Sequence, residues 1–307
     1  MTTCTFFSRS FSGGYMVRYL FGMGLLLSTG LAQAATLSFT TNAESNSSSG
    51  VQSNPQGPAA NGSLTSSVTT SDGSNLAFSG PALATVAADA NGHSGLAVEG
   101  VFSRGNQFNS LTATANFTQQ FTNSSSANQS FLYDFTIFGP TLTLADYAGL
   151  AAGDLNPPLS AFYSVEITVN HGTGPNMVFS SMGTLTGGRL GHDLTTDGTN
   201  PFTGTLFGAG NNIFGYNFSG ISSSISDIAL PGETISISST LTTGMRGPGF
   251  EVGGGATIGD PNNLSLGSGF SGNLTVVPIP GALWLLISGV FGLLGLMRRS
   301  KHPANIT

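Results

Sequence analysis

Apolar and polar residues alternate along much of the chain between residues 76 and 276. Such alternation is typical of β-strands that bury one face and expose the other to solvent. Clusters of Gly, Pro, Asn and Asp separate the alternating runs, as at Gly139-Pro140 and Leu230-Pro231-Gly232. The pattern predicts roughly ten to fourteen strands. The clearest runs are Leu111, Ala113, Ala115, Phe117; Phe131, Tyr133, Phe135, Ile137; Tyr163, Val165, Ile167, Val169; and Ile235, Ile237, Leu241.

These runs predict an all-β body. No long segment has the periodicity of an amphipathic helix, and only Leu142 to Ala152 is expected to form a short one. Strands with one wet and one apolar face are typical of antiparallel sheets, so we expect a β-sandwich or a jelly-roll-like fold.

The composition divides the chain into five parts. Residues 1–34 are predicted to be a signal peptide, and 35–75 a short strand followed by a flexible segment rich in Ser, Asn and Gly. Residues 76–276 form the predicted sandwich body. Residues 277–301 combine prolines, an apolar run and basic residues, and 302–307 form a short cytoplasmic tail.

The first 34 residues have the parts of a secretory leader. Met16-Val17-Arg18 precedes an apolar stretch from Tyr19 to Gly30, and the small residues Ala32 and Ala34 flank Gln33. Signal peptidase accepts this small-x-small pattern, so we predict cleavage between Ala34 and Ala35. An uncleaved anchor is the alternative, but the apolar stretch is shorter than the roughly 18 residues of a membrane span. Met16 is a second possible start of the chain.

The apolar run near the C-terminus is long enough to cross a bilayer. Ile279 to Met297 is nineteen residues without a charge, about 28 Å as a helix. Pro278 and Pro280 keep the preceding backbone extended. Trp284 suits the outer interface, and the positive-inside rule places the basic cluster in the cytoplasm and the body outside. This cluster consists of Arg298, Arg299 and Lys301.

Small residues recur within the predicted span. Ser288, Gly292 and Gly295 fall on one helix face at spacings of four and three, which would let another helix approach closely. The alternative is that small residues are simply common in membrane helices.

Together, these C-terminal features resemble the PEP-CTERM sorting domain, in its VPLPA-CTERM variant. The resemblance covers residues 277–301: the motif Val277, Pro278, Ile279, Pro280, then the apolar run, then Arg298-Arg299. The sequence differs in having Ile279 where the two name-giving variants carry Glu or Leu, and Gly281 where Ala is usual. The resemblance implies recognition by an exosortase, a membrane-embedded Cys-dependent peptidase or transpeptidase of Gram-negative bacteria, with processing near the prolines. A plain single-pass anchor is the alternative.

The leader and the resemblance together predict an exported protein. It would be anchored transiently in the inner membrane and then reach the cell surface or extracellular matrix, with signal peptidase and exosortase as partners and exopolysaccharide as a further candidate partner. We expect a non-enzymatic surface or matrix protein associated with exopolysaccharide or biofilm. A polysaccharide-binding module on the cell surface is the alternative, and an unrecognised secreted hydrolase ranks third.

The charge and the cysteine content of the chain exclude several classes of binding protein and metal site. Between Ala35 and Val276 there are three arginines against fourteen acidic residues, hence a net charge of −11. Nucleic-acid binding needs clustered basic residues and is therefore not expected. Cys4 is the only cysteine, which excludes disulfides within the chain and thiolate metal sites.

The body offers few candidates for chemistry. The body contains three histidines, His93, His171 and His192. The densest cluster of ionisable residues is His192-Asp193 with Asp197-Gly198. It lacks the alternating acidic ligands of a calcium loop, so we interpret it, like Asp260-Pro261-Asn262, as a polar turn. No hydrolase or dinucleotide motif is present, and no catalytic, cofactor or metal residue is predicted. Tyrosines that could stack on sugars are Tyr133, Tyr147, Tyr163 and Tyr216.

Overall fold

The computed structural model describes residues 35–47, 50–74, 81–102, 109–147, 149, 158–172, 174–248, 252–264, 269–277 and 289. Residues Gln33–Val276 form one compact unit. The rest of the chain forms a second unit, of which only Val277 and Gly289 are among the described residues.

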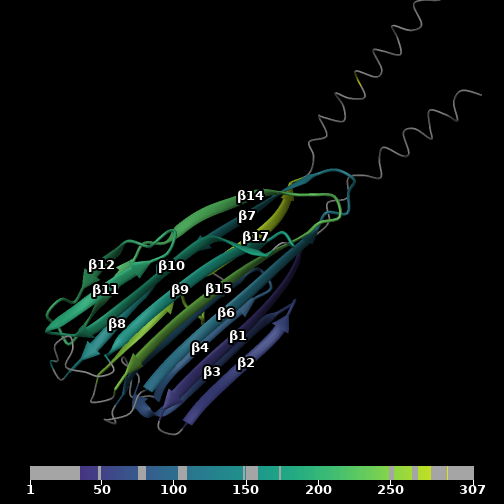
Figure 1. Ribbon diagram of the computed structural model, residues 1–307. Helices are drawn as coiled ribbons and strands as arrows, with labels where there is room; N and C mark the ends of the chain where they lie inside the picture. The colour runs from purple at the N-terminus through teal and green to yellow at the C-terminus, as the bar shows by residue number, and fades with distance from the viewer. Residues whose placement is uncertain are drawn as a thin grey trace, which may run out of the picture. The chain divides into compact units, whose positions relative to one another are not determined.

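Seven strands form the first sheet, called sheet A. Their order across the sheet is β11-β10-β9-β15-β6-β1-β2, and neighbours pair antiparallel (Figure 1). The strands are β1 (Thr36–Ser47), β2 (Gly50–Ala59), β6 (Asn109–Thr122), β9 (Ser160–Asn170), β10 (Pro175–Gly188), β11 (Gly191–Asp197) and β15 (Thr234–Gly247).

Ten strands form the second sheet, called sheet B. Eight follow the order β12-β13-β8-β16-β5-β17-β7-β14, while β3 and β4 pair with each other and with β5. The strands are β3 (Ser63–Ser74), β4 (Pro81–Asp89), β5 (His93–Phe102), β7 (Gln129–Ile137), β8 (Thr141–Asp146), β12 (Gly204–Phe207), β13 (Ile213–Phe218), β14 (Ile221–Ala229), β16 (Val252–Ile258) and β17 (Phe270–Val277).

The two sheets share one hydrophobic core. Along β6 every second residue from Asn109 to Phe121 is buried, as the alternation predicts. Phe117 of sheet A contacts Phe270 of sheet B with ring centroids 5.5 Å apart, and Phe135 meets Phe179 at 5.3 Å. The predicted all-β class with antiparallel sheets is therefore confirmed, and the arrangement is consistent with a β-sandwich.

The segment expected to be flexible forms strands instead. Residues 42–75 contain the end of β1 and all of β2 and β3. The edge strand β2 pairs with β1 through its backbone, and almost all of its side chains are exposed. Such a strand needs no apolar face, so its polar sequence carries no alternation. Exposed strands of this kind also explain why seventeen strands are described where fewer were predicted.

The prediction of a short helix from Leu142 to Ala152 was wrong for residues 142–146, which belong to a strand. Residues 141–146 form β8, in which Leu142 and Leu144 are buried and Thr141 and Thr143 are not. Alternation over so few residues was too short to separate a strand from one helical turn. Among the described residues, no helix has the length and apolar character needed to cross a bilayer.

Candidate functional site

A polar groove of about 510 Å³ runs across one edge of sheet B. It crosses the start of β5 and the neighbouring strands β17, β7 and β14, which lie side by side in Figure 1. Phe131, Tyr133 and Phe135 of β7 are buried, so the residues between them face outward. The groove therefore lies on the outer face of the sandwich. Its outward-facing lining residues are His93, Asp134, Thr136, Ser222, Ser224, Ser271 and Asn273.

Side chains on adjacent strands bring their polar groups together in the groove. Ser222 lies opposite Thr136, and their hydroxyl oxygens are 2.9 Å apart. Ser224 lies opposite Asp134 on the same two strands. The result is a lattice of hydroxyl and carboxylate groups on a rigid sheet, which can offer hydrogen bonds to a polar ligand.

The turn between β4 and β5 forms one wall of the groove. The Asp89 carboxylate accepts hydrogen bonds from the backbone N–H groups of Asn91 and His93, and its other oxygen lies 3.3 Å from His93 Nδ1. Gly92 has φ +78°, and a Cβ there would lie 2.3 Å from the carbonyl oxygen of Gly272. This close approach fixes the turn against β17, because the Gly272 N–H donates to the Gly92 carbonyl at 3.1 Å.

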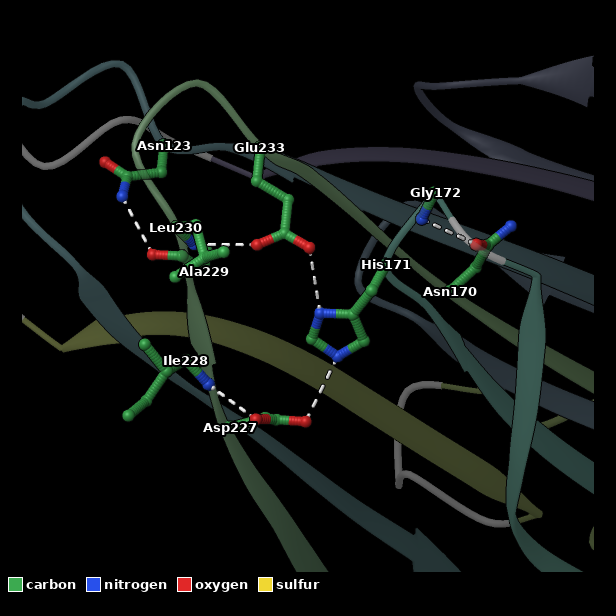
Figure 2. Close-up of polar contacts among 9 residues, drawn as sticks. All are labelled: Asn123, Asn170, His171, Gly172, Asp227, Ile228, Ala229, Leu230 and Glu233. Atoms are coloured by element: carbon green, nitrogen blue, oxygen red, sulfur yellow. Dashed lines mark hydrogen bonds and ion pairs between the residues drawn. The ribbon is translucent and has the colours of Figure 1, made fainter.

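A second polar cluster centres on His171, which follows β9 (Figure 2). Its Nδ1 lies 3.1 Å from Glu233 Oε1, and its Nε2 lies 3.1 Å from Asp227 Oδ2. Glu233 Oε2 accepts a hydrogen bond from the Leu230 N–H at 2.7 Å. Because Asp227 belongs to β14 of sheet B while Glu233 directly precedes β15 of sheet A, His171 joins the two ends of the connection between the sheets.

The His171 geometry favours a structural role over a catalytic one. Both ring nitrogens face carboxylates, so neither is directed at a nucleophile as in a Ser-His-Asp triad. A neutral imidazole donates from one nitrogen only, so donation to both carboxylates requires the imidazolium form. The carboxylates flank opposite sides of the ring, and no group of three His, Cys, Asp or Glu among the described residues could hold a metal ion.

The cluster around His192 is a strand and not the expected turn. His192 and Asp193 lie in β11, paired with Gly187 and Thr186. The His192 ring packs on Phe214, with ring centroids 4.8 Å apart. The chain bends only after β11 ends at Asp197, where the Gly198 N–H donates to Asp197 Oδ1 at 2.7 Å.

The other expected turn, at Asp260, is confirmed. The Asn262 N–H donates to Asp260 Oδ1 at 2.8 Å, and the Asn263 N–H donates to the Asp260 carbonyl at 3.1 Å. The Asp260 side chain thus closes the turn in the way that Asp-Pro sequences favour.

Two of the four tyrosines considered for sugar stacking belong to the core. Tyr133 and Tyr163 are each 1% exposed. Burial raises the pKa of Tyr133 to about 12, opposed by a hydrogen bond with Ser239. Burial also raises the pKa of Tyr163, opposed by hydrogen bonds with Ser181 and the Phe202 backbone. Neither phenol ring can stack on a ligand, whereas Tyr147 is 46% exposed.

Most of the predicted processing residues lie outside the described part of the chain. This applies to Ala32 and Ala34 of the leader, to Pro278, Ile279 and Pro280, and to the membrane and basic residues Trp284, Ser288, Gly292, Gly295, Arg298, Arg299 and Lys301. Ala35 and Val277 are described: Ala35 immediately precedes β1, and Val277 is the last residue of β17.

Sequence reasoning missed both polar clusters. The exposed serines of β14 were one available signal, because three of them (Ser222, Ser224 and Ser226) share the outward face of one strand. No comparable signal existed for His171, whose partners Asp227 and Glu233 lie 56 and 62 residues away along the chain.

Comparison with known proteins does not assign the chain to a family. No protein-family model matches the chain, and no curated protein is similar to it. One solved structure, "Structure of infectious bursal disease virus Gx strain", aligns over 81% of this chain and 68% of that chain at 11% identity. Its TM-score is 0.09, so the alignment carries no argument about fold or function.

Proposed function

We propose that this chain is an exported, non-enzymatic surface or extracellular-matrix protein that is sorted and processed through its C-terminal signal by an exosortase-type peptidase. The order of segments supports this proposal: a leader with a cleavage site at Ala34-Ala35, a β body, a Pro-x-Pro motif, an apolar run and a basic cluster. The setting we propose is a matrix that contains exopolysaccharide.

The observation that carries the proposal is where the core ends. Among the described residues, those of the buried hydrophobic core lie between Phe39 and Val276. The last strand, β17, ends at Val277, one residue before the Pro-x-Pro motif. Cleavage near Pro278 or beyond would therefore remove none of the core residues that the structure describes, and the released body would keep their packing. A signal placed directly after this core suits a protein that is anchored first and freed later.

The experiment follows the C-terminus of the protein in cells with and without the sorting peptidase. Membrane fractionation combined with intact-mass measurement should show released protein lacking Trp284 and Arg299 only when the peptidase is present. Replacing Pro278 and Pro280 with Ala should leave full-length precursor in the membrane, because the helix could then extend toward the body. The matched control Pro303→Ala, beyond the basic cluster, should be processed normally.

Two outcomes would contradict the proposal. If the wild-type protein keeps Arg299 in both strains, the tail is a plain anchor. If the Pro278 and Pro280 variant is processed like wild type, the extended motif is not what the peptidase recognises.

Neutralising Arg298, Arg299 and Lys301 should instead loosen the topology and release some full-length precursor, since these charges hold the cytoplasmic end in place.

A further inference from the structure

The geometry points to the groove on the outer face of sheet B as a binding site for a neutral glycan chain. This inference rests on the proposed function, since an exported matrix protein would meet such polymers. The site itself is argued from its geometry alone. The volume of about 510 Å³ is within the range of roughly 300–1,000 Å³ typical of pockets for small organic ligands.

The lining matches a ligand rich in hydroxyl groups. Ser222, Ser224 and Thr136 each provide a hydroxyl that can donate and accept, Asn273 provides an amide, and Asp134 provides a carboxylate acceptor. Sugar hydroxyls likewise both donate and accept, so each lining group can find a partner. Short side chains such as these also lose little rotamer entropy when a ligand orders them.

The spacing of these groups favours a polymer. Outward-facing residues two apart on one strand, such as Ser222 and Ser224, recur about 6.6 Å apart along the strand. Their neighbours on the adjacent strand, Thr136 and Asp134, lie directly opposite. A regular lattice that is open along its length can contact several consecutive rings of a chain whose hydroxyls also repeat regularly.

Charge selects neutral glycans over acidic ones. Asp134 lines the groove, and Asp89 lies next to it at the end of β4, while the lining contains no Arg or Lys. The body as a whole carries eleven more acidic than basic residues. A uronate or sulfate chain would be repelled, most strongly at low ionic strength.

Other ligand classes fit less well. A peptide that adds a strand would pair with the free edge of β14, the last strand of sheet B. It would then lie beside the groove and not in it, because β17 and β7 are interior strands that present only side chains there. An apolar ligand would leave the serine and carboxylate groups without partners at a cost in free energy. One carboxylate among the lining residues is too few for a cation site, since calcium takes six to eight oxygen ligands.

The binding experiment uses the full-length chain, purified from a strain without the sorting peptidase, in lauryldimethylamine oxide, a detergent without a sugar headgroup. Titration calorimetry with hexasaccharides of cellulose, laminarin, mannan, xylan and starch should show binding of at least one. An alginate hexasaccharide should bind at least tenfold more weakly than the best neutral one at low ionic strength. Native electrophoresis in gels containing the corresponding polysaccharide should show retardation of the protein.

Variants locate the site. Ser222→Ala with Ser224→Ala should weaken binding roughly three- to tenfold for each hydrogen bond lost, and Asp134→Asn should weaken it roughly tenfold. Ser226→Ala is the matched control, because Ser226 is exposed on the same face of β14 but does not line the groove. It should bind as wild type. All of these positions are exposed, so circular dichroism should show an unchanged β-sheet spectrum.

The inference is overturned if none of the hexasaccharides binds, if alginate binds as tightly as the best neutral glycan, or if the groove variants bind like Ser226→Ala. If the protein cleaves a hexasaccharide and Asp134→Asn abolishes this cleavage, the groove is a hydrolase active site and not a binding site. These outcomes are independent of sorting: loss of glycan binding leaves the C-terminal processing assay unchanged, and failure of processing leaves the titration unchanged.

Discussion

Tyr133 shows how one residue couples the core to pH. Its side chain is buried on β7 of sheet B, and its hydroxyl lies 2.9 Å from the Ser239 hydroxyl on β15 of sheet A. The phenol therefore hydrogen-bonds across the core as a neutral group. Burial opposes its ionisation, which is why its pKa rises from 10.0 to about 12.

We predict that this shift makes the fold sensitive to alkali. Above about pH 10 the unfolded chain releases the Tyr133 proton while the folded chain retains it, so stability is full below pH 10 and falls until about pH 12. The loss attributable to Tyr133 should be about 2 to 3 kcal/mol. Urea unfolding of the full-length chain in detergent, repeated from pH 8 to pH 12, measures it.

The comparison variant is Tyr133→Phe. It should be less stable than wild type at pH 8 by about 1 kcal/mol, because Ser239 loses a buried partner. Its stability should nevertheless fall less steeply between pH 10 and pH 12, with the remaining slope assigned in part to Tyr163, whose pKa burial also raises. Parallel pH profiles for the two proteins would show that the Tyr133 phenol is not responsible.

At the scale of elements, the passage from β14 to β15 is held by a polar hub. His171 contacts Asp227 and Glu233 on either side of this passage, as Figure 2 shows. The buried Asn123 adds two hydrogen bonds, from its Nδ2 to the carbonyls of Ala127 and Ala229. Backbone hydrogen bonds also hold this passage: the Gly232 N–H donates to the Asn123 carbonyl at 2.7 Å, and the Asn123 N–H donates to the Glu233 carbonyl at 2.8 Å. Side-chain and turn contacts thus fix the connection from the edge strand of sheet B to the middle of sheet A.

The two carboxylates of this hub should differ in importance. Glu233 has a side chain only 17% exposed, whereas that of Asp227 is 50% exposed. We expect Glu233→Gln to lower the free energy of unfolding by about 1 to 2 kcal/mol and Asp227→Asn by about 0.5 kcal/mol or less, since solvent screens exposed pairs. Urea unfolding in low and high salt measures both, and His171→Ala in each background tests the coupling. Equal effects, or a larger effect at Asp227, would contradict this ranking.

At the scale of the whole molecule, the body begins and ends close to its proposed processing points. β1 starts at Thr36, two residues after Ala34, and pairs from that residue with Gln120 of β6. β17 ends at Val277, beside the Pro-x-Pro motif. Removal of the leader and the tail at the proposed points would therefore leave intact every strand that the structure describes.

We predict that the exported protein begins at Ala35. Ala34→Leu should block cleavage because signal peptidase requires a small residue there, whereas Gln33→Leu should leave the cleavage point unchanged because the middle position is unconstrained. N-terminal sequencing of the exported material measures both. A mature protein that starts at Met1 or Met16 would show that the leader is retained.

Local pattern was informative where a strand is covered on one face and open on the other. In β6, β7, β9 and β15, each apolar residue of the alternating run faces the core, so burial can be predicted from neighbours two residues apart. The exposed strand β2 has no such contrast, and the alternation in the interior strand β8 covers too few residues to identify a strand. Strands were thus predictable where the alternating run is long, and were missed where the strand is exposed or short.

The sequence by itself determined the all-β class, the central strands, the acidic character of the body and the expectation of processing signals at both ends. Each of these follows from composition or from residues a few positions apart. Only the tertiary structure decided which polar groups meet. Asp134 and Ser224, or His171 and Glu233, become neighbours through strand pairing and sheet crossing between residues far apart in the chain. Periodicity reports which face a side chain occupies, but it contains no information about the strand that will lie beside it.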